Sequence, residues 1–224
     1  MKVSSKQSGD NDILDQFYLK ATPFVKSAAS LLNLGCGERF NFERLLKKMN
    51  PDIRITSIDQ VDLAEKPSCV DKYVRADLEQ PMSFGQFDAV TFFEIIEHLD
   101  NTDNLLKTCF SNLKAGGTLV FSFPNLSSIY SRMELLLGFQ PHILEVSNQA
   151  GHFGTGIFGR LNGNQPHEAI HHIRGITHRA MKELVKYHGF DIICVMGAST
   201  NRIRLFNGFP SIAPVNIFVC RKSA

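Results

Sequence analysis

The stretch Leu31-Leu32-Asn33-Leu34-Gly35-Cys36-Gly37-Glu38 decides the fold. Three apolar residues around one polar residue predict a short buried strand, and Gly-x-Gly follows it at once. The apolar spacing of residues 42–49 then predicts a helix. Strand, glycine turn and helix are typical of the opening of a nucleotide-binding βαβ unit, because glycines let a ligand approach the backbone and the free N–H groups of the turn can bind it. A Gly-x-Gly alone is a weak signal, and a plain turn explains it equally well, so later features have to decide.

Length and composition fit one α/β domain. The chain has 224 residues, of which 43% are hydrophobic and 21% charged, as is usual for a globular domain. A net charge of +2 with scattered Lys and Arg does not favour nucleic acid as a partner. We expect residues 1–11 to be disordered and residues 12–224 to form a single domain.

The cysteines and the apolar runs bear on the compartment. The five cysteines are odd in number and lack C-x-x-C spacing, and Cys109, Cys194 and Cys220 lie in apolar periodic segments. This pattern is typical of reduced core thiols. Apolar runs of membrane-spanning length are absent, and the polar start of the chain is unlike a signal peptide. These features predict a cytoplasmic location.

Strand and helix patterns alternate along the chain. A leading helix begins near residue 13 and is interrupted or restarted at Pro23, and a later helix covers residues 102–113 and ends at Gly116-Gly117. Further strands are expected at residues 53–59, 73–78, 87–94 and 117–123, with a final hairpin formed by 191–196 and 216–221. Strands alternating with helices predict a doubly wound, mostly parallel sheet.

Two of these strands end in an aspartate. Asp59 closes the second strand, roughly two dozen positions beyond the glycines, and Asp77 closes the third. A dinucleotide-type fold places an acid near the first of these positions to accept hydrogen bonds from ribose hydroxyls. The two aspartates therefore predict one wall of a ligand crevice.

Residues 125–170 break the alternation. Gly, Asn, Gln, Pro and His are frequent there, and the only helical pattern lies near residues 129–137. A connection this long inside a compact domain is usually functional or mobile. We expect a substrate-side insertion after the fifth strand that supplies the acceptor pocket. Its histidines, His142, His152 and His167, have no assigned role.

With these pieces placed, the sequence resembles the class I S-adenosylmethionine-dependent methyltransferases over roughly residues 30–222. The segments that carry the resemblance are Leu32-Asn33-Leu34-Gly35-Cys36-Gly37, Ser57-Ile58-Asp59, Ala76-Asp77-Leu78, Phe87-Asp88-Ala89-Val90 and Leu113-Lys114-Ala115-Gly116-Gly117-Thr118-Leu119. The resemblance implies a Rossmann-like, seven-stranded sheet with an antiparallel last strand. It also implies S-adenosyl-L-methionine as the cofactor.

The resemblance further implies which residues bind that cofactor. They are Asn33, Gly35, Cys36, Gly37, Asp59, Gln60, Asp77, Leu78 and Phe93. Two departures stand out: the family usually carries an acid where Asn33 stands, and Glu38-Arg39 replace a third glycine. Because of these two departures, a module that binds the cofactor without catalysing a reaction remains an alternative.

The segment Glu94-Ile95-Ile96-Glu97-His98 begins at the carboxyl end of the fourth strand, where such sheets bind ligands. If it is helical, positions 94, 97 and 98 share one face. A hydroxyl acceptor needs a base within hydrogen-bond reach. His98, oriented by Glu97 or Glu94, is the first candidate, and His172 is the second. The alternative is that these side chains only brace the next helix and line the cofactor pocket.

The residues after the fourth strand indicate which chemical group accepts the methyl group. Phe92-Phe93-Glu94 occupies the place of the Asn-Pro-Pro-Tyr-type motif that amide or adenine N-methylation requires, which favours O-methylation of a small-molecule, sugar or lipid hydroxyl. We assign no metal. The alternative is a metal-dependent enzyme acting on RNA ends, because Glu94, Glu97, His98 and His172 match the residue types with which small-RNA 3′-terminal 2′-O-methyltransferases hold a divalent ion. The oligomeric state is not predicted.

Overall fold

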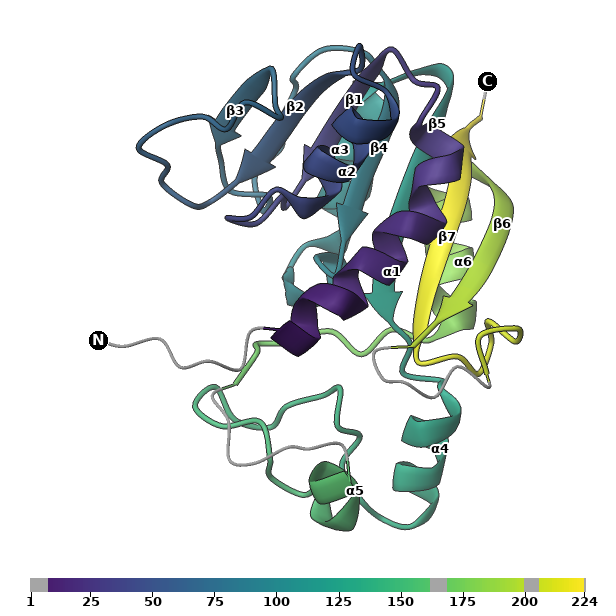
Figure 1. Cartoon of the computed structure of the whole chain (residues 1–224). Helices are drawn as coiled ribbons and strands as arrows, with labels where there is room; N and C mark the ends of the chain where they lie inside the picture. Colours follow the sequence, from purple (N-terminus) through teal and green to yellow (C-terminus); the bar gives the residue numbers. More distant parts are fainter. Residues whose placement is uncertain (1–7, 162–168, 200–205, 224) are drawn as a thin grey trace.

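A seven-stranded sheet forms the centre of the protein, with strand order β3-β2-β1-β4-β5-β7-β6 (Figure 1). The computed structural model describes residues 8–161, 169–199 and 206–223. The strands are β1 (Ser30–Leu34), β2 (Arg54–Asp59), β3 (Lys72–Arg75), β4 (Phe87–Phe93), β5 (Leu113–Pro124), β6 (Phe190–Ala198) and β7 (Val215–Lys222). Strands β1 to β5 pair in parallel, and β7 is antiparallel to both β5 and β6. The predicted fold is therefore confirmed, including the C-terminal hairpin.

Helices cover both faces of the sheet. Figure 1 shows α1 (Ser8–Val25) and α2 (Asn41–Met49) on one face, with α3 (Thr102–Asn112) and α6 (His178–Tyr187) on the other. Each face has its own apolar cluster. Strand β4 contributes to both, because Phe92 packs with the α3 and α6 side and Phe93 with the α1 and α2 side. A strand buried on both faces belongs in the middle of a parallel sheet, as its sequence indicated.

Several predicted boundaries differ from the structure. Helix α1 begins at Ser8, inside the segment expected to be disordered, because a first turn needs no apolar residues; residues 1–7 lie outside the described part. Pro23 does not interrupt this helix, which continues to Val25 although Pro23 cannot donate a backbone hydrogen bond. Strand β3 stops at Arg75, which pairs with the last residue of β2, so Asp77 lies beyond the strand.

The junction of α3 and β5 also differs. The helix ends at Asn112 and the strand begins at once with Leu113, whereas the sequence placed the helix end at Gly116-Gly117. Leu113 pairs with Phe87, and the register then shifts before the ladder resumes. Gly116 has a φ of +70° within this irregular stretch, so it serves a bulge in the strand and not a helix end.

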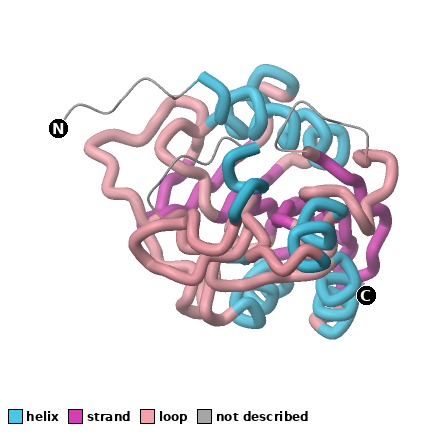
Figure 2. The backbone as a smooth tube through the Cα atoms, turned by 90° about the horizontal axis from the view of Figure 1, so that it is seen from below, coloured by secondary structure: helices cyan, strands magenta, loops and turns pink. Residues whose placement is uncertain are grey.

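The connection between β5 and α6 forms a separate layer. It carries α4 (Ile129–Leu136) and α5 (Gly156–Leu161) and lies beneath the carboxyl ends of the parallel strands (Figure 1). Figure 2 looks from that end, with the loops of this layer in front of the strands. Residues 162–168 of the expected insertion lie outside the described part. Among the described helices none has the length and apolar character needed to cross a membrane.

Candidate functional site

The turn after β1 has the geometry that its glycines predicted. Gly35 and Gly37 have φ values of +75° and +63°, which side chains rarely adopt. The turn is tied to β2, because the N–H groups of Gly35 and Cys36 donate to the carbonyl of Ile58 at 2.8 and 3.2 Å. The two glycines differ in their surroundings. A Cβ on Gly35 would lie 2.2 Å from Cδ1 of Ile95, whereas a Cβ on Gly37 would meet open space. Gly37 is therefore the point at which a ligand can reach the backbone.

Asp59 and Asp77 lie at the same edge of the sheet as this turn. Asp59 Oδ2 accepts the N–H of Gly37 at 2.7 Å, and its Oδ1 accepts the N–H of Gln60 at 2.8 Å. The side chain of Gln60 bridges onward, donating to Asp77 Oδ1 at 3.1 Å. One chain of contacts thus joins the glycine turn to both aspartates. The residues that the sequence predicted to form one wall of a ligand crevice therefore lie beside one another.

Asn33 is turned away from the crevice. It is 2% exposed, donates to Glu43 Oε1 at 2.7 Å and accepts from Thr91 Oγ1 at 2.8 Å. Glu43 on α2 also accepts the hydroxyl of Ser57 at 2.7 Å, and burial raises the pKa of Glu43 despite these two donors. The acid that the motif lacks at position 33 therefore stands beneath the turn at position 43. A contact from Asn33 to a cofactor would require this network to open.

The remaining predicted cofactor residues are apolar or thiol groups. Leu78 is 5% exposed and belongs to the core cluster on the α3 side. Phe93 packs edge-on against Tyr18 and Phe42, with ring centroids 5.1 and 4.8 Å away, so its ring lies in the core under the α1 face. Burial raises the pKa of the Cys36 thiol far above its ordinary value, which makes this group an inert lining residue.

Glu94 directly follows β4 in a strained conformation. Its φ of +53° is in the left-handed region, which is uncommon for a side-chain-bearing residue and recurs at functional sites. The helical alternative considered for residues 94–98 therefore holds only for η1 (Ile96–His98). Glu94 Oε1 accepts the hydroxyl of Ser122 at 2.6 Å. Loss of hydration raises the pKa of Glu94 to about 7, against the opposing effect of that hydrogen bond.

Glu97, His98 and His172 converge at the end of this segment. One ligand atom from each lies within 4.8 Å of the other two. Glu97 is 1% exposed, and within the described structure neither of its carboxylate oxygens has a hydrogen-bond partner. The Nε2 atoms of His98 and His172 lie 3.9 and 3.8 Å from Glu97 Oε1. An unpartnered buried carboxylate is costly, so this group calls for a proton or a cation between the three side chains.

Backbone carbonyls fix the tautomer of both histidines in the neutral form. His98 Nδ1 lies 3.1 Å from the carbonyl of His171, and His172 Nδ1 lies 3.0 Å from that of Ile143. A carbonyl only accepts, so Nδ1 carries the hydrogen and Nε2 keeps a lone pair directed to Glu97. Burial lowers the pKa of His98, and burial together with the nearby His98 lowers that of His172 to about 4. Burial and the neighbouring Glu94 raise the pKa of Glu97.

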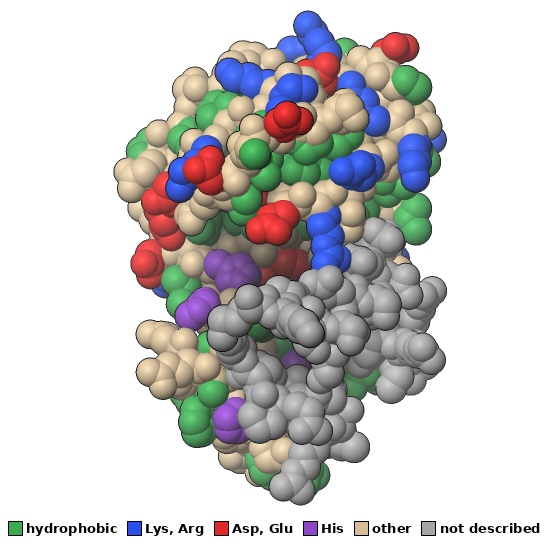
Figure 3. Space-filling view, turned by 60° about the vertical axis from the view of Figure 1, so that its left-hand side comes forward, with side chains coloured by type: hydrophobic (Ala, Val, Ile, Leu, Met, Phe, Trp, Pro, Cys, Tyr) green, Lys and Arg blue, Asp and Glu red, His purple; other side chains and the backbone are tan. Residues whose placement is uncertain are grey.

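Long-range contacts hold this group together. The N–H groups of Ile173 and Arg174 both donate to the carbonyl of Glu97 at 3.0 Å, which places the segment of His172 against η1. The guanidinium of Arg174 donates to the carbonyls of Leu99 and Asp100, so it braces the backbone. Figure 3 shows histidine and acidic side chains gathered around a hollow between the sheet and the layer of α4 and α5.

The sequence named Glu97 as a partner for His98 and, in the metal-dependent alternative, as an ion ligand, and both histidines converge on it. Two other features of the site were not predicted. Glu43 carried no signal apart from its place on the helix. His142, left without a role, is paired with Glu134 on α4 at 2.8 Å. An acid at i−8 in an irregular segment follows no periodic pattern, so this pair required the structure.

Comparison with known proteins identifies the family of the chain. The family model described as a methyltransferase domain matches residues 9–195. Two curated relatives are ubiquinone biosynthesis O-methyltransferases: that of Dechloromonas aromatica is 28% identical over 108 residues, and that of Shewanella halifaxensis is 28% identical over 118 residues. These matches cover 42% and 48% of this chain, and 44% and 48% of the relatives. The chain thus spans less than half the length of the curated relatives it matches.

Solved structures agree on the fold. A methyltransferase of Burkholderia thailandensis that acts on 1,6-didemethyltoxoflavin, crystallised with S-adenosylhomocysteine, has a TM-score of 0.61 and 14% identity, and the match covers 96% of this chain and 80% of that one. A SAM-dependent methyltransferase from Archaeoglobus fulgidus has a TM-score of 0.60 and 16% identity, covering 95% and 94%. Because the family model matches most of the chain, the chain belongs to the methyltransferase domain family.

Proposed function

We propose that this protein transfers a methyl group from S-adenosyl-L-methionine to a hydroxyl group of a small molecule, sugar or lipid, and that Glu97, His98 and His172 hold a divalent cation for this reaction. The observation that carries the proposal is the convergence of one unpartnered carboxylate and two imidazole lone pairs at the carboxyl end of β4. In open α/β sheets ligands bind at this end of the strands. The catalytic residues proposed from sequence, Glu94, His98 and His172, all lie there.

The donor atoms are close enough together to share such an ion. Glu97 Oε1 lies 3.9 and 3.8 Å from the two Nε2 atoms, and the three ligand atoms all lie within 4.8 Å of one another. Ligand atoms about 2.1 Å from one ion are at most about 4.2 Å apart, so the side chains would draw together slightly on binding it. Two imidazoles with a carboxylate suit first-row divalent ions. A bound cation would lower the pKa of a hydroxyl group next to it.

The low pKa values favour a ligand role for the histidines over the base role expected from sequence. A general base works best with a pKa near the operating pH, and that of His172 is about 4. A metal ligand needs only its lone pair, which both Nε2 atoms retain at neutral pH. Glu94, with a pKa raised to about 7, remains suited to accept or return a proton near the ion.

The cofactor would be bound by the crevice wall on the β1 and β2 side. When bound, it supplies an electrophilic methyl group on a sulfonium. Gly37 leaves open space for the cofactor beside the backbone, while its N–H is bound to Asp59, and Asp59 offers carboxylate oxygens to ribose hydroxyls. Asp77 and Gln60 extend the wall toward the adenine side. The protein's task is then to position the acceptor and to exclude water.

A second candidate is methylation of the terminal 2′-hydroxyl of RNA. The same three metal-ligating side chains favour it, because their residue types match those of the RNA enzymes named above. Glu94, the fourth matching residue, is bonded to Ser122 and lies outside the three-residue group. A net charge of +2 gives little phosphate attraction. We therefore rank this candidate second.

A methyl-transfer assay separates the candidates. The full chain is dialysed against EDTA and incubated with S-adenosyl-L-methionine labelled in the methyl group, with and without Mn²⁺, Mg²⁺ or Zn²⁺. The acceptors are phenol, catechol, a hexose, a prenylated phenol and a short 3′-hydroxyl RNA. We expect transfer to a small hydroxyl acceptor that depends on the metal. Transfer to RNA alone would favour the second candidate, and cofactor binding without any transfer would indicate a non-catalytic module.

A further inference from the structure

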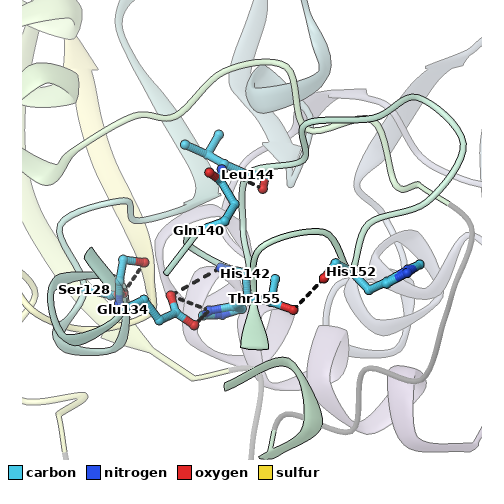
Figure 4. A network of polar contacts seen from close by, with 8 residues as sticks. Ser128, Glu134, Gln140, His142, Leu144, His152 and Thr155 are labelled. Carbon is cyan, nitrogen blue, oxygen red and sulfur yellow. Dashed lines mark hydrogen bonds and ion pairs between the residues drawn. The ribbon is translucent and has the colours of Figure 1, made fainter. Parts of the chain in front are cut away.

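The layer beneath the strands contains a buried carboxylate–imidazole pair (Figure 4). Glu134 on α4 is fully buried, and its two carboxylate oxygens lie 2.8 and 3.0 Å from His142 Nδ1. The backbone N–H of His142 also donates to Glu134 Oε2, at 3.2 Å. A buried carboxylate is unfavourable unless it is hydrogen-bonded and paired. All these donors come from one residue, so the pair fixes the orientation of a single imidazole.

The pairing also fixes the tautomer. A carboxylate only accepts hydrogen bonds, so His142 Nδ1 carries the hydrogen and Nε2 keeps its lone pair. Among the described residues, no side chain or backbone group is hydrogen-bonded to that Nε2. The His142 side chain is 21% exposed. A ligand can therefore reach the nitrogen that Glu134 leaves available.

The segment of His142 is attached to the segment that carries His172. The carbonyl of the following residue, Ile143, contacts His172 Nδ1 at 3.0 Å, and a positive charge on His142 is close enough to help lower the pKa of His172. Glu145 extends the attachment, because its carboxylate accepts the N–H groups of Ile170 and His171 at 2.9 and 2.7 Å. The segment 140–145 is thus attached to the segment that carries His172.

We propose that His142 is the general base for the acceptor hydroxyl and that Glu134 is its positioning residue. The inference rests on the proposed function. The hydroxyl proton passes to His142 Nε2 while the oxygen forms a bond to the methyl carbon. The carbon–sulfur bond breaks, and its electron pair stays on sulfur. The products are the methyl ether, S-adenosylhomocysteine and a protonated imidazole, which releases its proton to water.

This assignment divides the work among the histidines. His98 and His172 direct their lone pairs at Glu97, whereas His142 directs its Nδ1–H at Glu134 and leaves Nε2 for the acceptor. An imidazole held by a buried carboxylate is the arrangement by which serine hydrolases orient their base and stabilise the imidazolium that forms. The layer of α4 and α5 therefore supplies a catalytic side chain in addition to covering the ends of the strands.

The first test is acceptor-independent. In the full chain with ¹⁵N-labelled histidine, long-range ¹H–¹⁵N spectra should show the Nδ1–H tautomer for His142. His188 is an internal control of the opposite kind, because its Nε2 lies 2.7 Å from Asp103 Oδ1 and should carry the hydrogen. The substitution Glu134→Gln should remove the tautomer preference of His142 alone. A hydrogen on His142 Nε2 in the wild-type protein would overturn the proposal.

The second test measures transfer to the best acceptor of the panel above. His142→Ala should lower kcat about 10²–10⁴-fold with an unchanged cofactor dissociation constant, and free imidazole should restore part of the loss. Glu134→Gln should lower kcat about 10–100-fold, as for other carboxylates that orient a histidine. His188→Ala, which removes the partner of Asp103, should leave kcat unchanged.

The outcomes separate this proposal from the proposed function. If the wild-type protein methylates a hydroxyl acceptor and His142→Ala does so at the same rate, the assignment of His142 as the base is overturned and the proposed function stands. A loss in His142→Ala that imidazole does not relieve, together with weakened cofactor binding, would show a structural role and would also overturn it. A wild-type protein that methylates no hydroxyl would overturn the function, and the base role with it.

Discussion

Replacing Glu97 should abolish the stabilisation of the folded chain by a divalent cation. A ligand that binds only the folded state at 100 times its dissociation constant stabilises it by about 2.7 kcal/mol. In a domain of this size each kcal/mol raises Tm by about 2–4 °C, so saturating metal should raise Tm by about 5–11 °C. Glu97→Gln keeps the volume but removes the charge of the buried side chain on which His98 and His172 converge. Its Tm should not respond to the metal.

The assay is thermal unfolding of EDTA-treated protein with added Mn²⁺, Mg²⁺ or Zn²⁺. Glu183→Gln is the matched control, because Glu183 is exposed and pairs with Arg179 at 3.1 Å; it should keep the full response. Without metal, Glu97→Gln should be at least as stable as the wild type, since an unpartnered buried carboxylate costs about 1–3 kcal/mol. Equal metal responses in wild type and Glu97→Gln would refute the assignment of this group as a metal site.

Three further predictions concern the strand ends and the glycine turn. Lys114, at 2.7 Å, and Ser30 hold the pKa of Asp88 below its usual value, so its stabilisation is complete above the ordinary pKa and is lost as the pH falls through the depressed one. Asp88→Asn should therefore cost about 1 kcal/mol in urea unfolding at pH 7 and almost nothing in strong acid. Gly35→Ala should cost about 2–5 kcal/mol, because left-handed strain adds to the 2.2 Å clash with Ile95. Gly37→Ala, facing open space, should cost only the strain, about 1–2 kcal/mol, in the same assay.

Each of these has a clear opposite outcome. If the loss of unfolding free energy in Asp88→Asn is the same at neutral pH and in acid, the charge of the carboxylate is not what stabilises the start of β4. Equal costs at Gly35 and Gly37 would show that Ile95 does not press on the turn. A Gly37→Ala variant that is stable but binds the cofactor less well would agree with ligand approach at this glycine.

Local patterns predicted the sheet and the crevice wall. A strand buried on both faces, such as β4, is visible as an apolar run, and a left-handed turn such as that at Gly37 favours glycine. Both depend on neighbouring residues only. Parallel pairing then brings the ends of β1 and β2 to one edge, so Asp59 could be placed near the turn before the structure was known.

The catalytic end could be predicted only in part, because it depends on contacts between distant segments. Glu97 and His172 are brought together by the backbone bonds of residues 173 and 174 to η1, and no periodicity announces such a contact. Asn33 turned inward because Glu43 offered a buried acceptor. The pair of His142 and Glu134 lies in a layer without regular repeats, so its composition suggested a solvated loop.

Calorimetric titration of the full chain with S-adenosyl-L-methionine tests the central claim most directly. We predict one cofactor per chain for the wild type, and an affinity lower by about 1–3 kcal/mol in Asp59→Ala, the cost of leaving hydrogen-bonding partners unmatched in the crevice. Asp52→Ala, in the exposed turn before β2, should bind as the wild type does. The absence of binding to the wild type, or equal affinities in Asp59→Ala and Asp52→Ala, would contradict a cofactor crevice between the glycine turn and Asp59.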